Sequence, residues 1–119
     1  MTTSINMAVI DELLSLTDEG DASLLTDLIQ MFLEDAPIKL NSIKTGFAKR
    51  DMHQVEKAAH SMKGSAGNLG ATAVQDLCDQ LQNACRLANP EKIAGLVTQL
   101  EAPFAQVLRD LRTLLEKHS

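Results

Sequence analysis

The sequence predicts an all-α fold, an antiparallel four-helix bundle with a short extra helix at the N-terminus. Apolar residues recur at helical spacing along most of the chain, and no stretch alternates as a half-buried strand would. Hydrophobic residues make up 45% of the chain, with three Phe and no Trp or Tyr, so Leu, Ile, Val, Ala and Met must form the core. With 119 residues, we expect a single domain over 1–119 whose residues 1–5 are frayed.

The first two expected helices lie between residues 4 and 50. Ser4 or Asn6 can cap a short helix that ends between Thr17 and Gly20 and carries Val9, Ile10, Leu13 and Leu14. Asp21 is a suitable N-cap for a long helix carrying Leu24, Leu25, Leu28, Phe32, Leu40, Ile43 and Phe47. Pro37 lies inside that helix, and we expect it to bend or split the helix because proline lacks an amide donor.

Three further helices follow. Asp51 and Gln54 resemble a capping box at the start of the third helix, and Gly70 separates this helix from the fourth. The fourth carries Val74, Leu77, Cys78, Leu81, Ala84, Cys85 and Ala88. Asn89-Pro90-Glu91 is typical of a helix start, and Pro103 is expected to bend the last helix. Short connections favour an antiparallel bundle, with the first helix lying across one end.

The third helix places a histidine opposite its apolar stripe. At about 100° per residue, one direction gathers Val55, Ala59, Met62, Ala66 and Leu69. His60 lies far from the centre of that stripe, so we expect its imidazole to be exposed.

Gly64 and Gly67 follow His60 by four and seven residues and share its face. Each glycine inside a helix costs about 1 kcal/mol relative to Ala, and the compensating gain is clearance for another molecule beside the imidazole. For Gly67 a second interpretation stays open, because Gly67-Asn68-Leu69-Gly70 also reads as a helix stop signal.

The run His60-x-x-Lys63-Gly64-Ser65-x-x-x-Leu69-Gly70, preceded by Ala58-Ala59, resembles the signature of the histidine-containing phosphotransfer (HPt) domain family. These small helical bundles carry a phosphoryl group on one exposed histidine. The resemblance implies that His60 is the phospho-acceptor and that Lys63 stabilises the phosphoryl group. It also implies that Gly64 is the small docking residue and that Ser65 helps to orient the site. Gln82 falls where some members place a glutamine facing the histidine, although the sequence pattern alone does not fix which way this flank turns.

The same resemblance implies a phosphocarrier that exchanges its phosphoryl group with the aspartate of a receiver domain. The implied partners are response regulators and hybrid sensor kinases. The chain has no glycine-rich nucleotide loop and no Walker-type Lys, so we expect no ATP binding and no autonomous kinase activity. Ser61 stands where the dimerisation helices of sensor kinases place an acid, which also favours a passive carrier. We expect no cofactor on this chain and Mg²⁺ on the receiver.

The net charge and the two cysteines limit which partners and which cellular compartment we expect. A net charge of −5 argues against nucleic acid and against an anionic membrane surface as partners. No secretory signal or membrane-length apolar run is evident, and we expect a cytoplasmic monomer. Cys78 and Cys85 are two helical turns apart, too far for a mutual disulfide, and both are expected in the core.

Two other functions are compatible with parts of the pattern. A helical adaptor with an incidental surface histidine is the default for an isolated His, but the Lys63-Gly64 pair on the same face argues against it. A metal site could use His53, Glu56 and His60, yet His53 and His60 are about 10 Å apart along a helix axis, which short metal–nitrogen bonds do not span.

Overall fold

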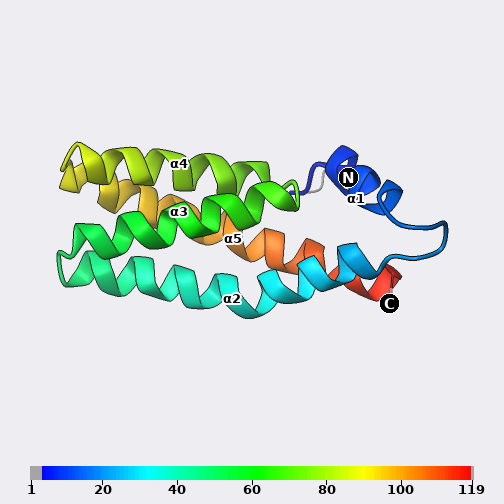
Figure 1. The fold of residues 1–119 in the computed structure, drawn as a ribbon. Helices are drawn as coiled ribbons and strands as arrows, with labels where there is room; N and C mark the ends of the chain where they lie inside the picture. Colours follow the sequence, from blue (N-terminus) through cyan, green and yellow to red (C-terminus); the bar gives the residue numbers. More distant parts are fainter. Residues whose placement is uncertain (1–3, 119) are drawn as a thin grey trace.

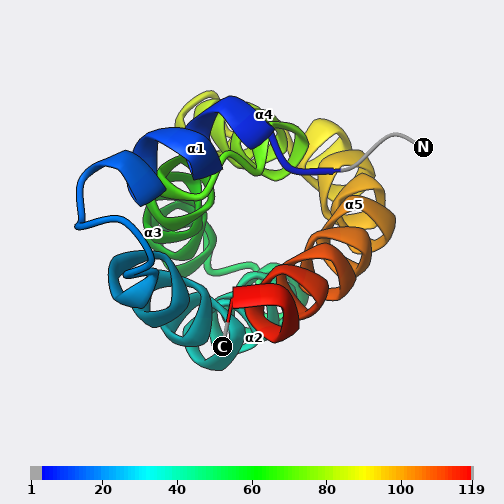
Figure 2. The same cartoon turned by 90° about the vertical axis from the view of Figure 1, so that its right-hand side faces the viewer.

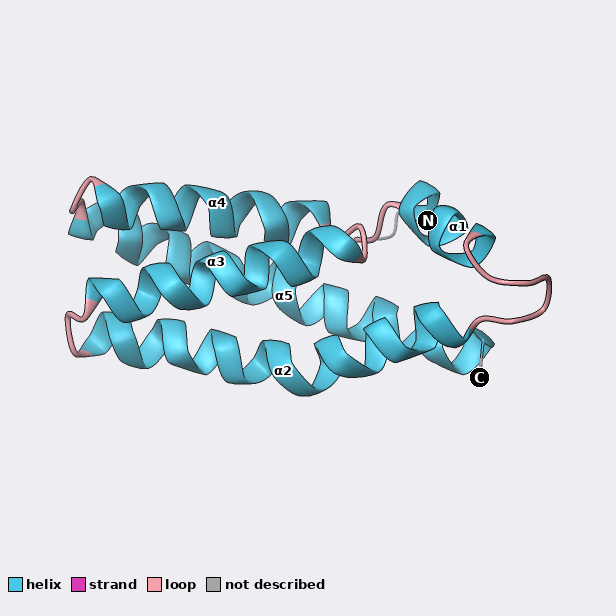
Figure 3. Ribbon diagram, viewed as in Figure 1, coloured by secondary structure: helices cyan, strands magenta, loops and turns pink. Residues whose placement is uncertain are grey.

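A computed structural model describes residues 4–118 of the chain. This part consists of five helices and contains no strand: α1 (Met7–Ser15), α2 (Ser23–Ala48), α3 (Met52–Asn68), α4 (Thr72–Arg86) and α5 (Pro90–His118) (Figures 1 and 3). The expected fold class and the number and order of the helices are therefore confirmed. None of the helices in the described range is both long and apolar enough to cross a membrane.

Helices α2 to α5 form the bundle in chain order. Each one packs against its predecessor, and α5 returns to α2, so the four helices close a ring around one core (Figure 2). Successive helices run in opposite directions along the long axis (Figure 1). The predicted stripe of the third helix lies inside this ring: Val55, Ala59, Met62, Ala66 and Leu69 are each at most 1% exposed.

Local capping signals explain most helix starts. The side chains of Asn6, Asp51 and Asn89 accept backbone N–H groups of the first turns of α1, α3 and α5, as expected. The cap of α2 differs by one residue from the prediction: Ala22 is the N-cap, and Asp21 accepts from Ser23 N one position earlier. The acidic side chain still satisfies a donor of the first turn, so the physical role of Asp21 is retained.

The expected capping box of α3 is formed only on the Asp51 side. The Gln54 amide donates to Ser42 O at 3.0 Å and to Thr45 Oγ1 at 3.1 Å, both on α2. Gln54 therefore ties α3 to α2 instead of bonding back to the N-cap backbone.

Three helices end in the same hydrogen-bonded motif. At the end of α3, Ala71 N donates to Ala66 O and Gly70 N donates to Gly67 O, with Gly70 at φ 75°. Equivalent bonds close α2 and α4, but there the left-handed residues are Arg50 (φ 59°) and Ala88 (φ 50°). Ala88, expected on the apolar stripe of the fourth helix, is consequently an exposed turn residue beyond its end.

The short helix α1 lies across the end of the bundle where α3 meets α4, as expected (Figures 1 and 2). Asn6 N donates to Gly70 O at 2.8 Å, and a Cβ on Gly70 would come within 2.9 Å of Asn6 O, so α1 rests directly on this turn. The expectation that residues 1–5 are frayed is wrong for residues 4 and 5. Ser4 N donates to Asp110 at 2.8 Å and Ile5 is 2% exposed, because the segment before α1 is anchored on α5. Residues 1–3 lie outside the described range.

Neither internal proline splits its helix. Pro37 is exposed on α2 between the buried residues Ala36 and Leu40, and α2 continues through it with a bend in its middle (Figure 1). Pro103 likewise lies inside a continuous α5. Packing of the flanking residues against the core holds each helix together across the missing amide donor.

Candidate functional site

His60 lies in the middle of α3 and is exposed to solvent. Its neighbours Ala59 and Met62 are buried, which fixes the orientation of the helix and leaves position 60 on the outside. The prediction that this imidazole is accessible is confirmed. In its neutral form an imidazole is one of few side chains that can act as a nucleophile near physiological pH.

Gln82 of α4 holds one nitrogen of that ring. Its Nε2 lies 3.1 Å from Nδ1 of His60, so the flank of α4 does turn toward the histidine. Gln82 is only 5% exposed, and within residues 4–118 it is the one polar residue that is buried. Packing around it therefore holds its side chain toward His60. The contact engages Nδ1, and Nε2 is the ring nitrogen that remains for a partner.

The amide of Gln82 can serve either tautomer of the ring. With its nitrogen toward Nδ1 it donates, and the ring proton then sits on Nε2. After a half-turn of the amide, Oε1 accepts a proton from Nδ1, and Nε2 of His60 carries the outward lone pair that nucleophilic attack requires. Gln82 can therefore form a hydrogen bond with either tautomer of His60 without moving the helix.

Two ion pairs flank the His60–Gln82 contact. Lys63 Nζ lies 2.8 Å from Asp79 Oδ1, and Arg86 Nε donates to Glu56 Oε1 at 2.8 Å. In each of the three pairs one residue lies on α3 and the other on α4, and the two are equally far along the chain from Ala71, at the turn between these helices. We call these three pairs the α3–α4 ladder; its middle rung is His60–Gln82.

The two glycines of the His60 face differ in their surroundings. A Cβ on Gly64 would meet no atom within 4 Å, so the expected open space beside the histidine exists there. A Cβ on Gly67 would lie 2.7 Å from Nε2 of Gln75, so the expectation of open ground at Gly67 is wrong. Gly67 lies inside α3 and allows the α4 side chain to approach, and its carbonyl takes part in the closing motif of the helix.

A family model described as Hpt domain matches residues 27–116, which include the whole ladder and Gly64. The chain belongs to the Hpt domain family. Membership confirms the predicted phosphorelay role, that of a carrier in two-component signalling, over the incidental-histidine adaptor. Members of the family interact with receiver domains and hybrid kinases.

Individual proteins agree with this assignment. Histidine-containing phosphotransfer protein 5 of Arabidopsis thaliana is 26% identical over 111 residues, covering 89% of this chain and 71% of the plant protein. The crystal structure of histidine-containing phosphotransfer protein B from Pseudomonas aeruginosa matches with a TM-score of 0.88 at 21% identity, over 98% of both chains. The HPT domain of a hybrid histidine kinase from Shewanella matches with a TM-score of 0.78 at 18% identity, over 96% of this chain and 95% of that domain. The two structures support the fold of this Hpt domain.

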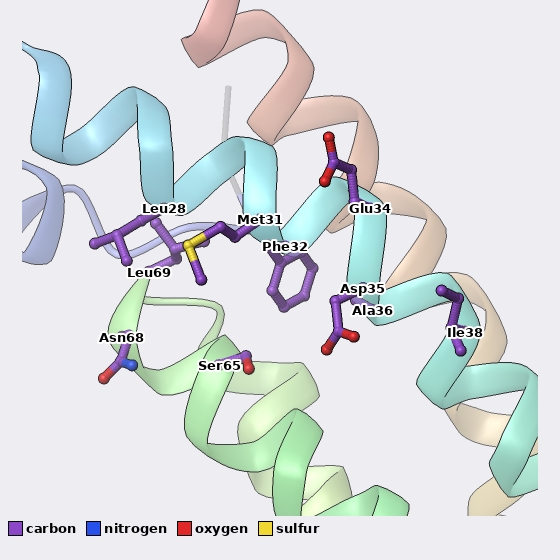
Figure 4. Close-up of a pocket in the computed structure, with 10 residues that line it drawn as sticks. All are labelled: Leu28, Met31, Phe32, Glu34, Asp35, Ala36, Ile38, Ser65, Asn68 and Leu69. Atoms are coloured by element: carbon purple, nitrogen blue, oxygen red, sulfur yellow. The ribbon is translucent and has the colours of Figure 1, made fainter.

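Ser65 lies away from the ladder. Its hydroxyl donates to Ser61 O of its own helix at 3.2 Å, and its side chain lines a hollow of about 480 Å³ between α2 and α3 (Figure 4). The hollow is also lined by Met31, Phe32 and Asp35 of α2 and by Asn68 of α3. The structure therefore brings Lys63 and Gln82 of the expected site residues into the ladder with His60, and places Ser65 on the opposite flank of α3.

Glu56, Asp79 and Arg86 complete the ladder beside His60, and this arrangement was not predicted from the sequence. Their signal was available: each charged residue has a partner of opposite charge at the same distance from the α3–α4 turn. Glu56, considered above as a metal ligand, is bonded to Arg86. Within residues 4–118, no three His, Cys, Asp or Glu side chains are grouped closely enough to hold a metal ion.

The two cysteines are free and buried in α4, as expected. Burial raises the pKa of the Cys78 thiol from 9.0 to about 12. The pKa of Cys85 is also raised, first by burial and then by the nearby charge of Glu56. Both thiols are therefore protonated at neutral pH and belong to the core of the bundle.

Proposed function

We propose that His60 is the residue of this carrier that accepts and returns the phosphoryl group. The observation that carries the proposal is an exposed imidazole whose Nδ1 is held by the buried Gln82, which leaves Nε2 for the reaction. Gly64 supports it, because the space beside the ring is open to a docking protein.

The transfer is an exchange between a ring nitrogen and a carboxylate. Nε2 of His60 attacks the phosphorus of an aspartyl phosphate on a receiver domain. The N–P bond forms, the P–O bond to the aspartate breaks, and its electron pair stays on the released carboxylate. Nδ1 keeps its proton throughout, donated to Oε1 of Gln82. The reverse step returns the phosphoryl group to a receiver.

The other components of the reaction are assigned to the partner. This chain carries no glycine-rich nucleotide loop or Walker-type Lys, which supports a carrier without ATP binding or kinase activity of its own. The receiver then supplies Mg²⁺ and the acidic pocket that activates the phosphoryl group. We place the carrier in the cytoplasm as a monomer. It binds neither nucleic acid nor an anionic membrane surface, in keeping with its net charge of −5.

Labelling from a phosphorylated receiver domain tests this proposal. The chain is expected to gain a phosphoryl label that is lost in acid, and His60→Gln is expected to abolish it while the far-ultraviolet circular dichroism stays helical. His53→Gln is the matched control, because His53 is an exposed histidine two turns earlier on the same helix, and it should retain full labelling. Undiminished labelling of His60→Gln would refute the assignment.

A further inference from the structure

Lys63 already has a partner in the unphosphorylated protein. Its ammonium lies 2.8 Å from Oδ1 of Asp79, and the two side chains are 37% and 45% exposed. This pair forms the rung of the ladder next to His60–Gln82, because Lys63 follows His60 by three residues on α3 and Asp79 precedes Gln82 by three on α4. The cation one helical turn after His60 on α3 is thus paired with a carboxylate.

A phosphoryl group on His60 changes the balance at this rung. It brings about two negative charges and three strong acceptor oxygens within one helical turn of Lys63. The phosphoryl group and the Asp79 carboxylate then compete for the same ammonium, and the charge of Asp79 also opposes that of the phosphoryl group.

We propose that Asp79 is a positioning residue that acts through Lys63: it holds the ammonium in the unphosphorylated protein and releases it to phosphorylated His60. The consequence is a lower affinity of His60 for the phosphoryl group than an unpaired Lys63 would give. A carrier benefits from this, because it must return the group as readily as it accepts it. This inference rests on the proposed function of His60.

The readout that isolates Asp79 is the equilibrium constant of phosphoryl exchange with a receiver domain. A receiver that labels the parent chain is mixed with it at concentrations too low for their complex to accumulate, and both phosphorylated species are quantified at equilibrium. A docking role of Asp79 would change forward and reverse rates equally and leave this constant unchanged. Only the relative stability of the phosphorylated and free forms can move it.

Asp79→Asn is expected to shift the equilibrium toward phosphorylated His60 by about two- to fivefold, the range that a partly exposed ion pair can supply. Asp76→Asn is the matched control for charge. Asp76 lies on the same helix as Asp79, and the two line a second, shallow hollow together with Lys63, but the carboxylate of Asp76 accepts from Gln80. This control should move the equilibrium less than Asp79→Asn does. Lys63→Met should shift the equilibrium toward the receiver, and in that background Asp79→Asn should have a smaller effect than it has in the parent chain.

Each other outcome would overturn the inference. An Asp79→Asn equilibrium equal to that of Asp76→Asn, or shifted toward the receiver, would mean that Asp79 does not compete for Lys63. An undiminished effect of Asp79→Asn without Lys63 would mean that the effect is not transmitted by the ammonium. If the parent chain takes no label at all, the proposed function of His60 itself fails, and this inference fails with it.

Discussion

Substitutions of Gly64 should separate the stability of α3 from access to His60. Gly64 lies inside the helix, and a Cβ there would meet no atom within 4 Å. Gly64→Ala therefore removes the glycine penalty without a clash and should stabilise the fold by about 1 kcal/mol, or about 4 °C in Tm for a domain of this size. Gly64→Gln should also stabilise the helix, but its longer side chain occupies the open space beside His60 in which a receiver domain would dock.

The two effects are measured by thermal unfolding and by the rate of phosphoryl transfer from one receiver. We expect Gly64→Gln to slow transfer at least about tenfold, since small displacements from reacting geometry are costly. Gly95→Ala is the matched control: this exposed glycine of α5 has only Gln99 Nε2 near its Cβ position, at 3.9 Å. It should raise Tm as Gly64→Ala does and leave transfer unchanged. Transfer by Gly64→Gln at the parent rate, with Tm raised, would refute the clearance argument.

Three more predictions concern single residues. Gln82→Leu should slow transfer about tenfold, because the Nδ1 proton of His60 loses its hydrogen-bond partner. The free energy of unfolding should change by less than about 1.5 kcal/mol. Phosphoryl-transfer assays quenched at successive times measure the rate, and urea titration measures the stability. Gly70→Ala should lower that free energy by about 2 kcal/mol in the same titration, because φ is 75° and Asn6 O lies 2.9 Å from the new Cβ. The pKa of Cys78 is about 12 in the folded protein and 9.0 in the unfolded chain. As pH rises above 9, the unfolded chain loses this thiol proton before the folded protein does, so the free energy of unfolding falls. The destabilisation caused by Cys78→Ala, from urea titrations at pH 8 and pH 10, should thus be about 1 kcal/mol smaller at pH 10.

Local and periodic features of the sequence were sufficient to predict the architecture. The stripe of α3 follows from helical periodicity alone, and its five residues are all in the core. Asn6, Asp51 and Asn89 cap their helices because an Asx side chain bonds to amides only two or three residues away.

Features that depend on tertiary context were not predictable in the same way. Arg50 and Ala88 adopt the left-handed conformation at the ends of α2 and α4 without the glycine that normally signals it. The anchoring of Ser4 depends on Asp110, more than one hundred residues away. No local pattern contains such a contact.

The candidate site lies between these two cases. His60 and Gly64 were identified from helical faces, since exposure on α3 is a property of one helix. The orientation of Gln82 required the register between α3 and α4, which the turn at Gly70 sets. Once that turn is centred on Ala71, the opposite charges of the ladder follow from the sequence.

The atom that bears phosphorus in the labelled protein is the most direct test of the site. Phosphorylation of ¹⁵N-labelled chain, followed by phosphorus–nitrogen correlation in the NMR spectrum, identifies the bonded ring nitrogen. We predict a single phosphohistidine at His60 with phosphorus on Nε2 and a proton on Nδ1. Phosphorus on Nδ1, or on His53 or His118, would contradict the arrangement in which Gln82 holds one nitrogen and leaves the other to the partner.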